Sequence, residues 1–69
     1  MEEFCERLKF LREEKGLTQK EVAEAIGFAQ SAVAFWENGK RIPNAFAIVA
    51  LAKFFDVTSD YLLGLTKFS

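Results

Sequence analysis

The sequence is divided into short segments in which apolar residues recur at helical spacing, and each segment is bounded by residues that typically begin or end helices. Within residues 2–15, Phe4, Leu8 and Leu11 recur at helical spacing, and Gly16 suits the position just after a helix C-terminus. No stretch of the chain alternates apolar and polar residues before a hairpin turn, as a strand would. The pattern therefore predicts an all-α fold.

A second helix is bounded by a capping sequence and a glycine. Thr18 and Glu21 have the spacing of a capping box, in which two side chains satisfy free backbone N–H groups reciprocally. Gly27 directly follows the last apolar residue of this segment, where a tight turn with positive φ favours glycine. A third helix over residues 30–37 is expected within about two residues of that turn, with Gly39 at its end. Its inner face would carry Ala32, Val33 and Trp36, and its outer face Gln30, Ser31, Ala34 and Phe35.

Two further helices complete the expected fold of five. Asn44 can cap a helix over residues 45–55, and a shorter helix capped by Thr58 or Ser59 would end at Leu63. The core stripe of the longer helix is expected to be Ile48, Leu51, Ala52 and Phe55.

Composition limits the classes of function. The 69 residues allow one domain, spanning 1–69, and 51% of them are apolar, as a folding chain requires. The single cysteine, Cys5, cannot form an internal disulfide, which favours a reducing, cytoplasmic setting. Without histidine or a second cysteine, no metal or cofactor is expected, and no Ser or Cys has an obvious base beside it, so the chain is not expected to be an enzyme. The longest nearly uncharged stretch, 42–52, is too short to cross a membrane.

Two short helices joined by a glycine turn, the second with a polar outer face, describe a helix-turn-helix. In this motif the first helix supports the second, which lays its outer side chains along the major groove of DNA. Residues 7–66 resemble the phage repressor and Cro-like helix-turn-helix family, also called the Xre family. The matching stretches are LTQKEVA (17–23), IG (26–27), QSAV (30–33), WENGKRIP (36–43) and DYLLG (60–64).

The resemblance implies a compact, lambda-repressor-like domain of five helices and a set of DNA contacts. Gln19 would touch a DNA phosphate, Gln30 would reach a base edge, and Ser31 would contact a base or a phosphate. A glutamine suits base recognition because its amide can pair bidentately with adenine. The resemblance also implies an ion pair between Arg12 and Glu37. The DNA backbone would be held by Asn38, Lys40 and Arg41, which positions the protein without reading sequence.

Three positions depart from the family pattern. Ala29 stands where a small polar residue usually caps the third helix, and the loss of a cap costs about 1 kcal/mol. Ala34 and Phe35 stand on the DNA side, where a phenylalanine can contact only thymine methyls or sugars. Phe10, Phe46 and Phe68 are also expected on the surface, and some of these phenylalanines would form a homodimer or partner interface.

Charge gives weaker support to DNA binding. The net charge of −1 is low for a DNA-binding domain, although most of the acidic residues precede residue 30, and Lys40 and Arg41 stand together beside the expected groove face. The sequence favours a regulator of transcription, expected to be a repressor, that binds double-stranded DNA as a dimer on a short palindrome. The alternative is a protein-interaction module, or an antitoxin-like partner, that keeps the fold with weakened DNA recognition.

Overall fold

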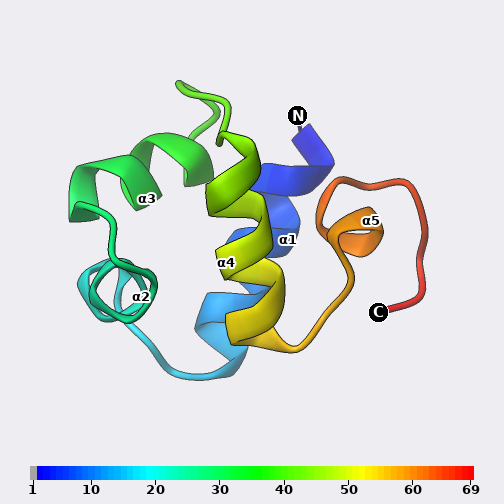
Figure 1. The fold of residues 1–69 in the computed structure, drawn as a ribbon, viewed down its shortest axis with the longest axis horizontal. Helices are drawn as coiled ribbons and strands as arrows, with labels where there is room; N and C mark the ends of the chain where they lie inside the picture. The colour runs from blue at the N-terminus through cyan, green and yellow to red at the C-terminus, as the bar shows by residue number, and fades with distance from the viewer. Residues whose placement is uncertain (1) are drawn as a thin grey trace.

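The computed structural model describes residues 2–69 and confirms the all-helical expectation, since these residues form five helices and no strand (Figure 1). The helices are α1 (Glu2–Glu14), α2 (Gln19–Ile26), α3 (Gln30–Glu37), α4 (Ala45–Phe55) and α5 (Ser59–Leu62). α1 and α5 each end one residue before the expected boundary. The reason is a tightening of the last turn, where the amides of Gly16 and Gly64 donate three residues back, to Glu13 and Tyr61.

In the view of Figure 1, α4 crosses the middle in front of α1, with α2 and α3 on one side of it and α5 with the C-terminal segment on the other. α1 contacts α3 and α5, whereas α4 contacts α2 and α5. All five helices contribute to one core, whose buried apolar side chains are Phe4, Leu8, Leu11, Val22, Ala23, Val33, Trp36, Ala47, Leu51, Phe55 and Leu62. The apolar faces expected in the first and third helices are therefore confirmed, with Ala32 packed at the edge of the core, and α2 contributes Val22 and Ala23 with Ile26 beside them.

The buried face of α4 was predicted only in part. Leu51 and Phe55 are buried as expected, but the third buried residue is Ala47, while Ile48 and Ala52 are half-buried beside the core. Ten of the eleven residues of α4 are apolar, with Lys53 as the exception. When a helix is apolar on all sides, the spacing of its apolar residues does not show which side is buried.

The C-terminal segment is attached to α1 through Arg7, for which no role was predicted. Its Nη1 atom donates to the carbonyl oxygens of Tyr61 and Thr66, and its guanidinium lies 4.4 Å from the centre of the Tyr61 ring. These contacts hold the C-terminal segment against α1, on the side of the molecule that lies away from α3 (Figure 1).

Within residues 2–69 we find no helix with the length and apolar character needed to cross a membrane.

Candidate nucleic-acid interface

Helix α2, which precedes the turn into α3, is fixed at both ends by local hydrogen bonds. The capping box at the start of α2 is confirmed, because Glu21 N donates to Thr18 Oγ1 at 3.0 Å and Thr18 N donates to Glu21 Oε1 at 2.8 Å. At its end, Gly27 takes the left-handed conformation with φ of 79°, and Phe28 N donates to the Ala23 carbonyl at 2.9 Å. α3 therefore starts at Gln30, immediately after the turn.

The far end of α3 is held by a bidentate ion pair, as the family resemblance implied. Arg12 Nε lies 2.6 Å from Glu37 Oε2, and Arg12 Nη2 lies 3.0 Å from Glu37 Oε1. The hydrogen bond to Glu37 raises the pKa of Arg12. Burial of the guanidinium lowers this pKa, and the negative charge of Glu37 raises it further. Arg12 also donates to the Leu17 carbonyl at 2.8 Å, so one side chain joins α1, the segment before α2, and α3.

Gln19 has a partner inside the protein that the sequence did not indicate. Its Nε2 atom donates to Glu37 Oε1 at 3.1 Å, and its side chain is half-buried. The expectation for Gln19 was a DNA phosphate contact. In the structure its amide extends the Arg12–Glu37 pair to the first turn of α2, and the phosphate contact of Gln19 stays a prediction.

Two of the expected base-reading residues lie free on the outer face of α3. Gln30 and Ser31 are exposed in its first turn. The residue before them, Ala29, has the extended backbone of an N-cap (φ −74°, ψ 150°) but provides no side-chain hydrogen bond, as its identity predicted. The first turn of α3 therefore presents two polar side chains beside uncapped backbone N–H groups.

The other two outer residues of α3, Ala34 and Phe35, are half-buried instead of freely exposed. The guanidinium of Arg41 lies 5.1 Å from the centre of the Phe35 ring. Phe35 was expected on the DNA side of α3, and in the structure a side chain from the following loop covers part of its ring.

The loop after α3 folds back onto the helix. Gly39 has φ of 76°, Gly39 N donates to the Trp36 carbonyl at 3.4 Å, and Lys40 N donates to the Phe35 carbonyl at 2.9 Å, which together form a Schellman motif. Asn38 Oδ1 also accepts from Lys40 N at 3.1 Å, so this side chain stabilises the turn. Lys40 and Arg41 are exposed beside the outer face of α3.

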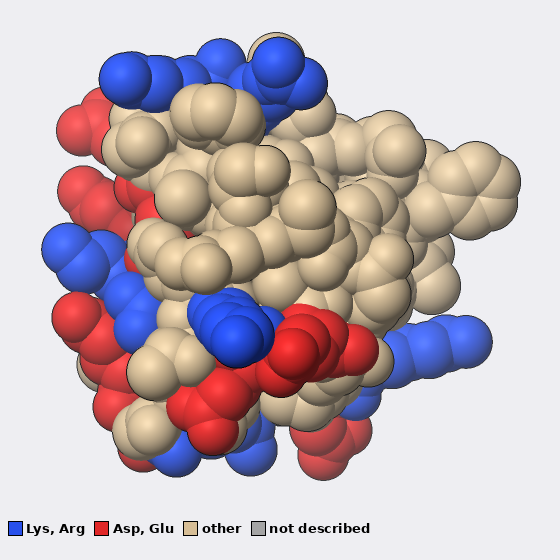
Figure 2. All heavy atoms as spheres, turned by 90° about the vertical axis from the view of Figure 1, so that its left-hand side faces the viewer, with Lys and Arg blue, Asp and Glu red and all other residues tan. Residues whose placement is uncertain are grey.

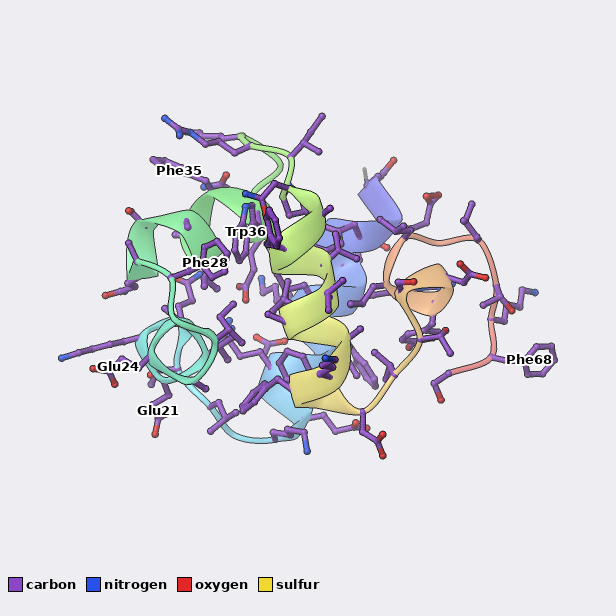
Figure 3. All side chains as sticks on the ribbon, in the orientation of Figure 1. Glu21, Glu24, Phe28, Phe35, Trp36 and Phe68 are labelled. Carbon is purple, nitrogen blue, oxygen red and sulfur yellow. The ribbon has the colours of Figure 1, made fainter. Side chains whose placement is uncertain are left out.

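Figure 2 looks onto the side of the molecule that α2 and α3 form. Lys and Arg atoms gather along its upper edge, where the loop after α3 lies, an uncharged band crosses the middle, and acidic and basic side chains mix below. Glu21 and Glu24 project from α2 on this same side (Figure 3). The positive charge beside the exposed polar residues of α3 thus lies at the upper edge, whereas the basic side chains lower on this face stand among acidic ones (Figure 2).

Comparison with known proteins gives consistent matches. A family model described as helix-turn-helix matches residues 8–62. The chain is 44% identical over 62 residues to the HTH-type transcriptional activator BcrR of Enterococcus faecalis, a match that covers 90% of this chain and 30% of BcrR. It is 41% identical over 63 residues to the HTH-type transcriptional regulator YobD of Bacillus subtilis, covering 91% and 56% of the two chains. The chain thus spans about half or less of the length of these two relatives.

Two solved structures share the fold closely. The P22 c2 repressor, determined in complex with a synthetic operator, superposes with a TM-score of 0.82 at 27% identity, over 86% of this chain and 89% of the repressor. The restriction-modification controller protein C.AhdI of Aeromonas hydrophila superposes with a TM-score of 0.81 at 34% identity, over 88% and 92% of the two chains.

Proposed function

This chain belongs to the helix-turn-helix family of phage repressor and Cro-like (Xre) proteins, and on that basis we propose that it regulates transcription by binding specific sequences of double-stranded DNA. α3 would enter the major groove, which is wide enough to admit a helix. Gln30 would read a base edge, Ser31 would contact a base or a phosphate, and the loop after α3 would hold the DNA backbone.

The observation that carries this proposal is the exposure of Gln30 and Ser31 on a helix that is held at both ends. The Gly27 turn places the start of α3, and the Arg12–Glu37 pair places its end. A side chain on such a preorganised helix loses little further freedom on binding. The Gln30 amide can then donate and accept in the plane of an adenine edge.

Lys40 and Arg41 supply the cationic part of the proposed interface. Each phosphate that a protein neutralises adds about 0.9 to the slope of log affinity against log salt. Two cations per copy are a small number, so we propose that the chain acts as a dimer on a short palindrome, which doubles the contacts. We further propose that it acts as a repressor, by occupying its operator.

The surface that we propose for pairing is the exposed face of α4. Phe46 is 82% exposed and Val49 51% exposed, and they lie one helical turn apart on a helix whose single charge is Lys53. A helix of this composition is normally covered. A second copy can cover it without blocking α3, because this face belongs to a different helix from the one that would contact DNA.

Substitutions at Gln30 and Arg41 test the proposal on a duplex obtained by selection from random DNA. Gln30→Ala should weaken binding to that duplex by about 1–3 kcal/mol and relax the preference at one base pair of each half-site. Arg41→Ala should weaken binding to all sequences and lower the salt slope by about 1 per copy. Lys67→Ala is the matched control, since Lys67 is an exposed cation in the C-terminal segment, away from α3 (Figure 1). The assignment of base recognition to Gln30 is wrong if its substitution leaves the base preference unchanged.

A second candidate function is that of a protein-interaction module, or an antitoxin-like partner, with weakened DNA recognition. Two observations favour it: Ala29 leaves α3 uncapped, and Glu21 and Glu24 project from the lower left of α2, on the face that α2 and α3 form together (Figure 3). The double substitution of Gln30 and Arg41 by alanine separates the two functions. It abolishes DNA binding under the first and leaves partner binding intact under the second.

A further inference from the structure

Two hollows of similar size border α3, and their linings differ in charge. One, of about 360 Å³, is lined by the carboxylates of Glu2, Glu6 and Glu37. The other, of about 350 Å³, has one guanidinium and no carboxylate among its lining residues. Its walls are aromatic and aliphatic, including Phe35 and Trp36, and its polar groups include Ser31 and Arg41. Of the two, only the second suits an anion with an apolar part.

The backbone of the loop explains why Arg41 lies at this second hollow. The left-handed turn at Gly39 brings the chain back, so that the Phe35 carbonyl accepts from Lys40 N at 2.9 Å and from Arg41 N at 3.4 Å. The Arg41 side chain therefore starts close to Phe35. Its guanidinium lies over the Phe35 ring, 5.1 Å from the ring centre. This arrangement is a cation–π contact.

A guanidinium on an aromatic face keeps its hydrogen-bonding edge available. Its N–H donors point outward in the plane of the group, whereas the ring approaches from the face. The residues described contain a single ion pair, that of Arg12 with Glu37, so no carboxylate neutralises Arg41. Arg41 is exposed, and without the ring its long side chain would sample many rotamers.

We propose that Phe35 is a positioning residue that holds Arg41 at the rim of this hollow, and that the hollow accepts one sugar–phosphate unit of the DNA backbone. The deoxyribose lies against the apolar wall, and the phosphate accepts hydrogen bonds from Arg41 and from the Ser31 hydroxyl. The inference rests on the proposed function, and it changes the expected role of Phe35. The residue acts through Arg41 and not by touching thymine methyl groups.

A double-mutant cycle on the full chain tests the positioning role. Phe35→Leu keeps an apolar side chain but removes the π face, Phe35→Tyr keeps the face, and Arg41→Ala removes the cation. A cation–π contact of 0.5–1 kcal/mol corresponds to an effect of about two- to fivefold, so Phe35→Leu should weaken binding to the selected duplex by that factor. Phe35→Tyr should bind as the unmodified chain does, and Phe35→Leu should have no further effect when Arg41 is already alanine. Circular dichroism of each variant verifies that the helices are retained.

Chemically altered duplexes test the subsite itself. Methylphosphonate, which removes the charge of one phosphate, is placed at each position of a half-site in turn. One position should weaken binding by the unmodified chain, have a smaller effect with Phe35→Leu, and have its smallest effect with Arg41→Ala, in which only the Ser31 hydroxyl is left to contact that phosphate. Replacement of thymine by uracil, which removes the methyl group, should affect the unmodified chain and Phe35→Leu equally.

Two results would overturn the inference while leaving the proposed function in place. One is an additive cycle, in which Phe35→Leu weakens binding equally with and without Arg41. The other is a thymine-to-uracil effect that disappears with Phe35→Leu, which would mean that the ring contacts a base. Failure of the unmodified chain to prefer any duplex would instead reject the proposed function.

Discussion

Glu37 shows how one residue can set the position of the proposed recognition helix. Its carboxylate accepts from Arg12 on α1 and from Gln19 on α2, while Glu37 itself is the last residue of α3. The Glu37 side chain is only 5% exposed and that of Arg12 14% exposed, so the charge of each is compensated mainly by the other and little by water. Removing one partner of such a pair leaves a charge buried without compensation.

Arg12→Ala should therefore lower the free energy of unfolding by about 3 kcal/mol. For a domain of this size that corresponds to a fall in Tm of about 10 °C or more. Urea and thermal unfolding followed by circular dichroism measure both quantities. Lys15→Ala is the control, because Lys15 is an exposed cation just after α1, and its removal should change stability by less than about 0.5 kcal/mol. Equal losses in the two variants would show that the ion pair does not contribute to stability.

The raised pKa of Arg12 also determines how this contribution depends on pH. A cation whose pKa is higher in the folded chain than in the unfolded chain stabilises the fold fully at any pH below the pKa of the unfolded chain. This stabilisation is lost only as the pH rises through the pKa of the folded chain. The loss of stability caused by Arg12→Ala should accordingly be unchanged between neutral and moderately alkaline pH. Unfolding curves of both proteins at several pH values check this, and a difference that shrinks as the pH rises would contradict it.

Among the helices, α3 is the one whose start depends most on its surroundings. α2, α4 and α5 have side-chain caps from Thr18, Asn44 and Thr58, at 3.0, 2.8 and 3.0 Å. α3 has none, because its N-cap residue is Ala29. Its first turn is held instead by the preceding turn, where the Phe28 ring packs edge-on against Trp36 with the ring centres 5.3 Å apart (Figure 3).

Ala29→Ser should stabilise the chain by about 1 kcal/mol, because the backbone at this position is already that of an N-cap. The corresponding rise in Tm is about 4–8 °C. Ala25→Ser, at an exposed position inside α2, is the control and should give no gain, since serine has a lower helix propensity than alanine. A Tm for Ala29→Ser at or below that of the unmodified chain would mean that the new hydroxyl does not cap α3.

The helices and their caps could be predicted because they depend on neighbours in the sequence. Thr18 with Glu21, and Gly27 after Ile26, fix local backbone geometry wherever they occur. Contacts that depend on how the chain reverses its direction could not be predicted from neighbouring residues. The hydrogen bond from Gln19 to Glu37 and the Arg41–Phe35 contact both arise only after the chain has turned back on itself. The Arg12–Glu37 pair was expected only through the family resemblance.

At the scale of the whole molecule, the exposed phenylalanines lie in separate places. Phe46 is 82% exposed on α4, Phe10 is 54% exposed on α1, and Phe68 is 83% exposed in the C-terminal segment, away from α3 (Figure 3). Single exposed apolar side chains are common, but Phe46 and Val49 share one helix face. That difference is the reason to assign pairing to α4.

Phe46→Glu should weaken dimer formation by at least about tenfold, because burial of a phenylalanine contributes about 1.5–3 kcal/mol per copy and the new charge would be desolvated. Phe68→Glu makes the same chemical change in the C-terminal segment and should leave association unchanged. Sedimentation equilibrium over a range of concentrations, with and without the selected duplex, measures the effect. If Phe68→Glu, and not Phe46→Glu, weakens association, the pairing surface has been misplaced.

Sequence-specific binding of duplex DNA by α3 can be measured by in-vitro selection from random duplexes at low and at physiological salt. We expect enrichment of a palindrome with half-sites about one helical turn apart, bound with an affinity that falls steeply as salt rises. Weak binding that is the same for all sequences would contradict it. In that case the exposed Gln30 and Ser31 would not read bases, and the search would turn to a protein partner.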